Sequence, residues 1–116
     1  MSVQKLLRAA SSLRDDADVF GGELTSNGIV DCVYNPLAYA WEVHKRYIEI
    51  SGDKGARTVM MGMNPGPHGM GQMGIPFAAT SMVRDLLGIS GIDVNQPSVI
   101  HPKRPVIGLD LSLIHI

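Results

Sequence analysis

Residues 57–77 read RTVMMGMNPGPHGMGQMGIPF, and the order of structural elements is clearest from this stretch. Residues 57–63 are short, apolar and bounded by turn signals, which is typical of a buried strand. Residues 64–76 contain four glycines and three prolines, which indicate a constrained loop. Because Pro65 disfavours the helical conformation at the residue before it, the strand is predicted to continue through Asn64.

Asn64 is thereby placed at the carboxyl end of a buried strand, the edge at which open α/β sheets bind ligands. Glycines let the backbone approach a flat ligand closely, and prolines lower the ordering cost of binding. Asn-Pro-Gly on its own is also a common structural turn. A phosphate-binding P-loop does not fit, because it needs a lysine and neither Lys nor Arg occurs between Arg57 and Arg84.

Helical patterns flank this stretch on both sides. Apolar residues recur at helical spacing from the N-terminus until Gly21-Gly22, where the helix is predicted to end. The predicted elements are helices over 2–19, from Asn35-Pro36 onward and over 81–87 with Thr80 as cap, and a short strand or extended segment over 29–34. This alternation predicts an α/β fold.

Composition limits the classes of protein that are possible. The chain has 116 residues, of which 45% are hydrophobic, and this length suits one small domain. No apolar run is long enough for a membrane span, and the N-terminus lacks the apolar core of a secretory signal. The single Cys32 excludes an internal disulfide and an iron–sulfur cluster. A formal net charge of −1 gives no indication of nucleic-acid binding.

The stretch from Gly62 to Phe77 nevertheless resembles the first active-site motif of the single-strand-selective monofunctional branch of the uracil-DNA glycosylase superfamily. Three further segments look like that family's neighbouring segments, namely 34–42, 81–89 and 101–106, so the resemblance covers roughly 34–109. It implies the N-terminal part of a three-layer α/β/α fold with a parallel sheet, cut short. We accordingly expect an N-terminal helix over 1–22 and the partial glycosylase-like domain over 23–110.

The last residues, 111–116, look like a translated sequencing adapter, and we expect them to be a non-native tail. A terminal strand is the alternative reading of this segment.

The resemblance implies an enzyme of DNA base-excision repair. Such an enzyme hydrolyses the N-glycosidic bond of uracil and of oxidised C5-substituted uracils, such as 5-hydroxymethyluracil, in single- and double-stranded DNA. Its partner would be DNA with the target base flipped out of the stack. The resemblance implies no cofactor, no metal and no membrane, and a monomer. The location would be intracellular, either the bacterial cytoplasm and nucleoid or the eukaryotic nucleus.

Residue roles carry over from the family's motif as follows. In the family, the residue at the position of Asn64 positions and polarises the attacking water. The residue at the position of Phe77 is the aromatic ring that stacks on the flipped base. Met63 matches a residue that lines the pyrimidine pocket through its backbone, and Gly66 and Met70 match residues near the C5 edge of the base. Uracil-specific relatives carry a tyrosine in place of Gly66, so glycine predicts room for a C5 substituent.

Basic residues downstream are candidate phosphate contacts, namely Lys103, Arg104 and Arg84. The simpler alternative is that they are solvated charges, and that Arg84 is a helix-surface residue beside Asp85. His44, on the apolar side of a predicted helix, is interpreted as a packed core residue.

The sequence departs from the family's pattern at several places. His68 stands where an aromatic residue is usual, and Gly71 and Met73 replace alanine and threonine, so the packing of the loop is open. The family's later His-Pro-Ser-Pro motif, whose histidine supports the leaving base, does not occur, and His101 belongs to a different segment. We therefore expect the chain to be poorly soluble, with little or no activity. A non-catalytic base-binding module and a purely structural α/β fragment stay open as alternatives.

Overall fold

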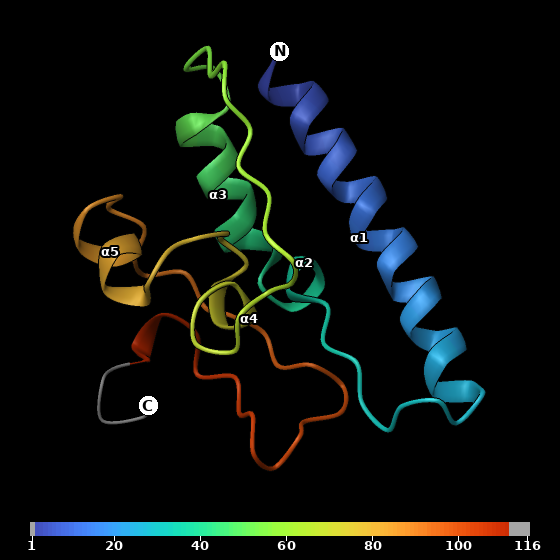
Figure 1. Ribbon diagram of the computed structural model, residues 1–116. Coiled ribbons are helices and arrows are strands. Elements are labelled where there is room, and N and C mark those ends of the chain that lie inside the picture. The colour runs from blue at the N-terminus through green and yellow to red at the C-terminus, as the bar shows by residue number, and fades with distance from the viewer. Residues whose placement is uncertain (1, 112–116) are drawn as a thin grey trace.

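The computed structural model describes residues 2–111 and consists of helices joined by long loops (Figure 1). Five α-helices and one 3-10 helix follow one another within residues 2–111. They are α1 (Val3–Ser26), α2 (Pro36–Tyr39), α3 (Trp41–Ser51), α4 (Met70–Met73), α5 (Thr80–Asp85) and the 3-10 helix η1 (Gly108–Asp110). The long α1 lies along one side, and the shorter helices with the loops between them form the rest of the molecule.

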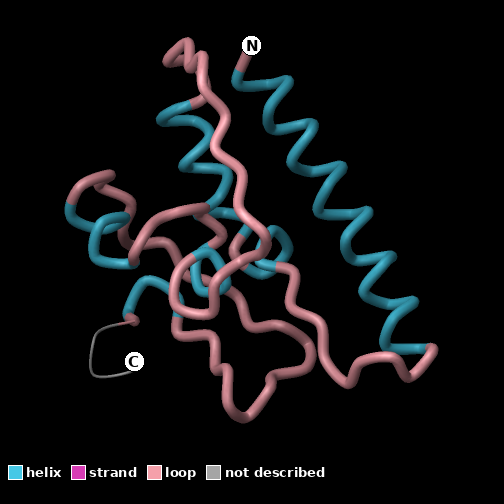
Figure 2. The backbone as a smooth tube through the Cα atoms, viewed as in Figure 1, coloured by secondary structure: helices cyan, strands magenta, loops and turns pink. Residues whose placement is uncertain are grey.

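The predicted α/β fold with a parallel sheet is wrong, because the structure contains no strand among residues 2–111 (Figure 2). Residues 57–63 are not a buried strand but an exposed loop, in which the side chains of Met61 and Met63 are 91% and 98% exposed. A strand is stabilised only by hydrogen bonds to a neighbouring strand. No described residue pairs with this segment, so apolar sequence alone did not make it a strand.

Ser2 is the N-cap of helix α1, and its hydroxyl accepts a hydrogen bond from the Lys5 N–H at 3.3 Å. It continues past Gly21, where the sequence predicted its end, up to the cap at Asn27. Gly21 is buried against Val33, since a Cβ atom at Gly21 would lie 2.9 Å from the Val33 Cγ1 atom. This tertiary contact offsets the cost of about 1 kcal/mol that a glycine brings to a helix interior.

The start of α2 agrees with the prediction. The Asn35 side chain accepts a hydrogen bond from the Leu37 N–H at 3.2 Å, and Pro36 occupies the first turn. The Asn35 amide also donates to the Arg14 carbonyl and to the Asp18 carboxylate, at 2.9 and 2.8 Å. One asparagine therefore caps α2 and docks it on α1. The helix that was predicted to run on from Pro36 is interrupted at Ala40, after which α3 begins.

The core lies where α3, α4 and α5 meet the C-terminal segment. Its buried residues are Val43, Met73, Ile75, Val83, Ile89 and Leu109. A smaller cluster of Tyr39, Ala40 and Val106 extends it toward α2. The first cluster includes Met73 and Ile75, so the glycine-rich loop is anchored in the core at its C-terminal end, while residues 57–63 stay outside the core.

Helix α5 differs slightly from the prediction, because Ala79 is its cap and Thr80 is already its first residue. The Thr80 hydroxyl is buried and forms no hydrogen bond with the described residues. Leu111, the first residue of the expected non-native tail, is buried, and the other residues of that tail, 112–116, lie outside the described part. None of the helices within residues 2–111 is both long enough and apolar enough to cross a bilayer.

Candidate functional site

A cavity of about 700 Å3 opens between the extended segment 60–66 and residues 76–79. All five residues to which the sequence assigned catalysis or base binding line it, namely Met63, Asn64, Gly66, Met70 and Phe77. Asn64 itself is exposed rather than packed in the interior. The amide is therefore accessible to a ligand and to water from the cavity.

Phe77 faces this cavity with an exposed ring and an unusual backbone. Its side chain is 62% exposed, and its φ of 57° lies in the left-handed region that residues other than glycine rarely adopt. The ring packs beside Gly62, because a Cβ atom at Gly62 would lie 3.3 Å from two of the ring carbons. The aromatic face is thus held next to the segment that carries Asn64, two residues further along.

A tight turn forms the loop between the two walls of the cavity. The Gly66 carbonyl accepts hydrogen bonds from the Gly69 and Gly71 N–H groups, at 3.4 and 2.8 Å. A Cβ atom at Gly71 would lie only 2.7 Å from the Gly66 carbonyl oxygen, whereas a Cβ atom at Gly66 would meet nothing within 4 Å. Gly71 is therefore required by packing, and Gly66 leaves free space at the cavity.

This difference predicts opposite outcomes for two alanine variants. Gly71→Ala should lower the free energy of unfolding by about 1–3 kcal/mol, because the new methyl group meets a backbone oxygen that cannot move without breaking the turn. Gly66→Ala is the matched control and should change it by less than about 0.5 kcal/mol. Chemical denaturation of both variants provides the measurement. Equal stabilities for the two would contradict the turn geometry.

Gln72 fixes the loop to the C-terminal segment, and sequence reasoning missed it. Its side chain is buried, with 4% exposure, and its amide donates to the Pro67 and Pro105 carbonyls at 3.0 and 2.9 Å. Its oxygen accepts from the Ile107 and Gly108 N–H groups at 2.6 and 3.0 Å. All hydrogen-bonding positions of the side chain are thus used. The only signal in the sequence was a long polar residue between glycine and methionine in an apolar stretch.

Two tyrosines form hydrogen bonds to the glycine-rich loop and to the segment 101–104. The Tyr39 hydroxyl donates to the Gly71 carbonyl, and its ring lies edge-on to the Tyr34 ring at 5.9 Å between centroids. Burial, with a smaller contribution from Tyr34, raises the pKa of Tyr39, so the hydroxyl keeps its proton and stays a donor. The Tyr34 hydroxyl donates to the Arg104 carbonyl and accepts from the His101 N–H, both at 2.7 Å.

His44 is a packed residue, as predicted, and lies away from the Asn64 cavity. Its Nδ1 atom is 2.7 Å from the Gly74 carbonyl, which can only accept, so Nδ1 carries the proton of this hydrogen bond. Burial lowers the pKa of His44, and the hydrogen bond to Gly74 partly opposes this. The imidazole is therefore neutral at pH 7 and secures the end of α4.

The three candidate phosphate contacts occupy different positions. Arg84 in α5 donates to the Leu109 carbonyl at 3.1 Å, which engages its guanidinium with η1. Lys103 and Arg104 are both exposed, and the Arg104 guanidinium donates to the Lys103 carbonyl at 2.9 Å. Arg104 also lines a second cavity, of about 420 Å3, together with Pro65 and Pro67. This second cavity shares Pro65 with the Asn64 cavity. Of the three candidate cations, Arg104 therefore lies next to the glycine-rich loop.

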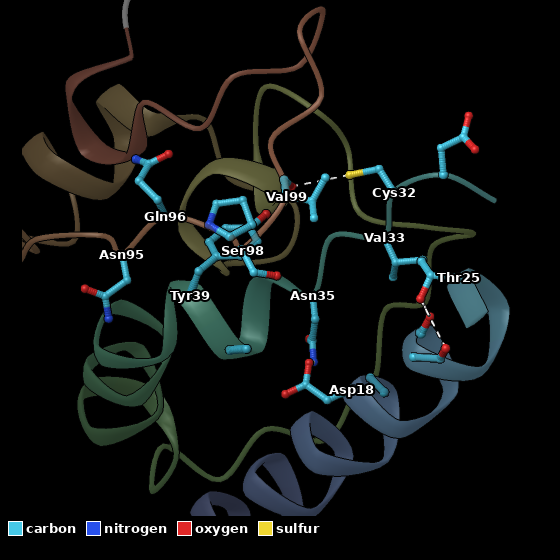
Figure 3. Close-up of a pocket in the computed structure, with 16 residues that line it drawn as sticks. Asp18, Thr25, Cys32, Val33, Asn35, Tyr39, Asn95, Gln96, Ser98 and Val99 are labelled. Atoms are coloured by element: carbon cyan, nitrogen blue, oxygen red, sulfur yellow. Dashed lines mark hydrogen bonds between the residues drawn. The ribbon is translucent and has the colours of Figure 1, made fainter. Parts of the chain in front are cut away.

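A third cavity, of about 610 Å3, lies between α1, the segment 31–35 and the segment 95–99 (Figure 3). The side chains of Asp18 and Asn35 meet at its floor, and the Cys32 thiol is 3.4 Å from the Val99 carbonyl. None of the predicted site residues lines this cavity. Within residues 2–111, no cluster of three or more His, Cys, Asp or Glu side chains could hold a metal ion.

Comparison with known proteins connects these residues to one kind of enzyme. No protein-family model matches the chain. The chain is 47% identical over 88 residues to the single-strand selective monofunctional uracil DNA glycosylase of Bos taurus. This match covers 76% of the chain and 32% of the Bos taurus protein. It is 48% and 47% identical over 81 residues to the proteins of the same name from Rattus norvegicus and Mus musculus, and each match covers 70% of the chain and 29% of the relative.

The chain thus spans about a third of the length of these relatives, while the matches include most of its own residues. By its sequence, the chain is related to the single-strand selective monofunctional uracil-DNA glycosylases.

Proposed function

We propose that this chain contributes to a uracil-DNA glycosylase of DNA repair the part of the active site that orients the attacking water and stacks on the extruded base. The observation that carries the proposal is the single cavity lined by Asn64, Phe77, Met63, Gly66 and Met70. The names of the relatives support the reaction class. The substrate would be DNA inside the cell, with single strands preferred, because extruding a base from a duplex costs a few kcal/mol.

The chemistry assigns one task to each wall of the cavity. Hydrolysis forms a bond from the water oxygen to the C1′ carbon of the deoxyribose and breaks the bond from C1′ to the base nitrogen. The bonding electrons leave with the base, and the proton that the water releases ends on the base. The amide oxygen of Asn64 accepts a hydrogen bond from the water and aims it at C1′, so orientation supplies much of the effect. The exposed ring of Phe77 offers the flat apolar surface on which the base stacks.

Arg104 supports this proposal as the contact for a DNA phosphate. It is exposed, it lies in the loop that Tyr34 holds by a hydrogen bond, and it lines the cavity that shares Pro65 with the Asn64 cavity. A base in the first cavity would place its own backbone near the shared rim. Lys103 is the adjacent second cation, and Arg84 belongs to this contact only if it releases the Leu109 carbonyl.

The direct test uses a single-stranded oligonucleotide with one uracil and the chain in excess. We expect binding, and residual base release that falls about 100-fold or more in Asn64→Ala, because misplacing the water by 1 Å costs about that factor. Asn27→Ala, at the exposed cap of α1, is the matched control and should not change release. Release that is unaffected by Asn64→Ala, or failure to bind the oligonucleotide, would contradict the proposal. Binding with no release would favour a non-catalytic base-binding module.

Substrate scope follows from the open space at Gly66. We expect the cavity to accept 5-hydroxymethyluracil as well as uracil. Gly66 has no side chain, and the space that a side chain would occupy there is empty, so the substituent at C5 of the base has room. Gly66→Tyr should fold normally and lose binding of the 5-hydroxymethyluracil oligonucleotide by about tenfold or more, an effect typical of steric exclusion in a pocket. Binding of the uracil oligonucleotide should be kept. Equal treatment of both bases by this variant would refute the steric explanation.

A further inference from the structure

The cavity around Asn64 has two polar side chains, and the second of them is His68. All other residues that line it are Met, Gly, Pro, Ala or Phe. His68 directly follows the Pro65–Pro67 segment and lines the same cavity as Asn64. Its side chain is exposed and forms no hydrogen bond with the described residues.

We propose that His68 donates a hydrogen bond to a carbonyl oxygen of the extruded pyrimidine; this assignment rests on the proposed function. A pyrimidine that stacks on Phe77 presents carbonyl oxygens at its edge, and these need donors once water is excluded. The proposed function assigns the Asn64 amide to the attacking water, and the other lining side chains carry no donor. The imidazole is therefore the side chain of this cavity that can satisfy a base oxygen.

The proposal has a signature in the pH dependence of binding. Histidine is the side chain that changes charge between pH 5 and 8. A hydrogen bond from the imidazolium is roughly twice as strong as one from the neutral ring. The remaining side chains that line the cavity are an amide, thioethers, an aromatic ring and small apolar groups, and none of them carries a charge. We therefore expect the affinity for the base to rise as the pH falls.

The experiment compares two single-stranded oligonucleotides that differ only at one position, which holds either uracil or an abasic tetrahydrofuran residue. Their affinities are measured by fluorescence anisotropy at pH 5.5 and pH 8. The ratio of the two affinities isolates the contact to the base, because any phosphate contact is common to both strands. For the wild-type chain we expect this ratio to be about five- to tenfold larger at pH 5.5 than at pH 8.

Three variants complete the test. His68→Phe should remove the pH dependence of the ratio while the stacking surface stays in place. His68→Gln keeps a neutral donor and should give an intermediate ratio that does not change with pH. His101→Gln is the matched control, because His101 lies outside the cavity and accepts from the Lys103 N–H, and it should behave as the wild type.

The outcomes separate this inference from the proposed function. If the ratio depends on Phe77 but is the same in His68→Phe and in the wild type, the assignment of His68 is overturned and the proposed function stands. If the affinity rises equally for the abasic strand, His68 contacts a phosphate, and the assignment to a base oxygen is overturned. If neither strand is preferred at either pH, the cavity does not bind the base, and the proposed function fails together with this inference.

Discussion

Replacing Gln72 by methionine should lower the free energy of unfolding by about 2–6 kcal/mol, because the Ile107 and Gly108 N–H groups lose their acceptor and each orphaned buried donor costs roughly 1–3 kcal/mol. The Pro67 and Pro105 carbonyls lose a donor at the same time. Methionine has a similar length and flexibility, so the apolar packing around the side chain is largely kept. The loss therefore reports the hydrogen bonds.

Gln96 provides the matched control for this substitution. Its amide donates one hydrogen bond, to the Val106 carbonyl at 3.0 Å, and its side chain is more exposed. Gln96→Met should cost only about 0.5–1.5 kcal/mol, the net value of a single hydrogen bond. Chemical denaturation gives both values, and hydrogen exchange at Ile107 and Gly108 locates the effect. If the two variants lost the same stability, Gln72 would not be the fastening point of the loop.

The importance of Gln72 could not be predicted from the sequence, because its partners are distant along the chain. Pro105, Ile107 and Gly108 lie 33, 35 and 36 residues after it. A local pattern carries no information on which backbone groups will be left without partners near a given side chain. The cap at Asn35 was predictable for the opposite reason, since the Leu37 N–H that it satisfies is two residues away.

The same distinction explains the error over residues 57–63. Apolar side chains favour burial in general, but a strand also needs a backbone partner that another part of the chain must supply. The described residues supply none, and the segment is an exposed loop. An exposed apolar segment of this kind favours association between chains, and the poor solubility of the chain stays a prediction.

The grouping of the candidate site residues in one loop was more predictable from the sequence than the overall fold, in which a sheet was expected to carry that loop. Residues 62–77 form a local bend, so the positions of Asn64, Gly66 and Phe77 relative to one another depend on short-range turns rather than on strand pairing. The left-handed backbone at Phe77 was not predictable, because a bulky residue rarely adopts it. The hydrogen bond from the Arg84 guanidinium to the distant Leu109 carbonyl was not predictable either, and a phosphate contact at Arg84 stays a prediction.

The second large effect concerns Phe77, the stacking surface of the cavity. Phe77→Ala should weaken binding of a uracil-containing single strand by about 5- to 150-fold, because stacking of a base on an aromatic ring contributes about 1–3 kcal/mol. The ring is exposed, lies beside Gly62 and belongs to neither buried cluster, so its removal leaves the buried core intact. Alanine pays the same backbone strain as phenylalanine at a φ of 57°, and the unfolding free energy should therefore change little.

Three further variants make this result specific. Phe77→Tyr keeps the ring and should retain affinity, whereas Phe77→Leu keeps apolar bulk without a π-face and should lose most of it. Asn64→Ala should bind within about twofold of the wild type, since an amide that orients water adds little to the ground-state complex. Fluorescence anisotropy at low salt measures all four variants. If Asn64→Ala lost as much affinity as Phe77→Ala, the amide would contact the base itself, and the division of work between the two walls of the cavity would be wrong.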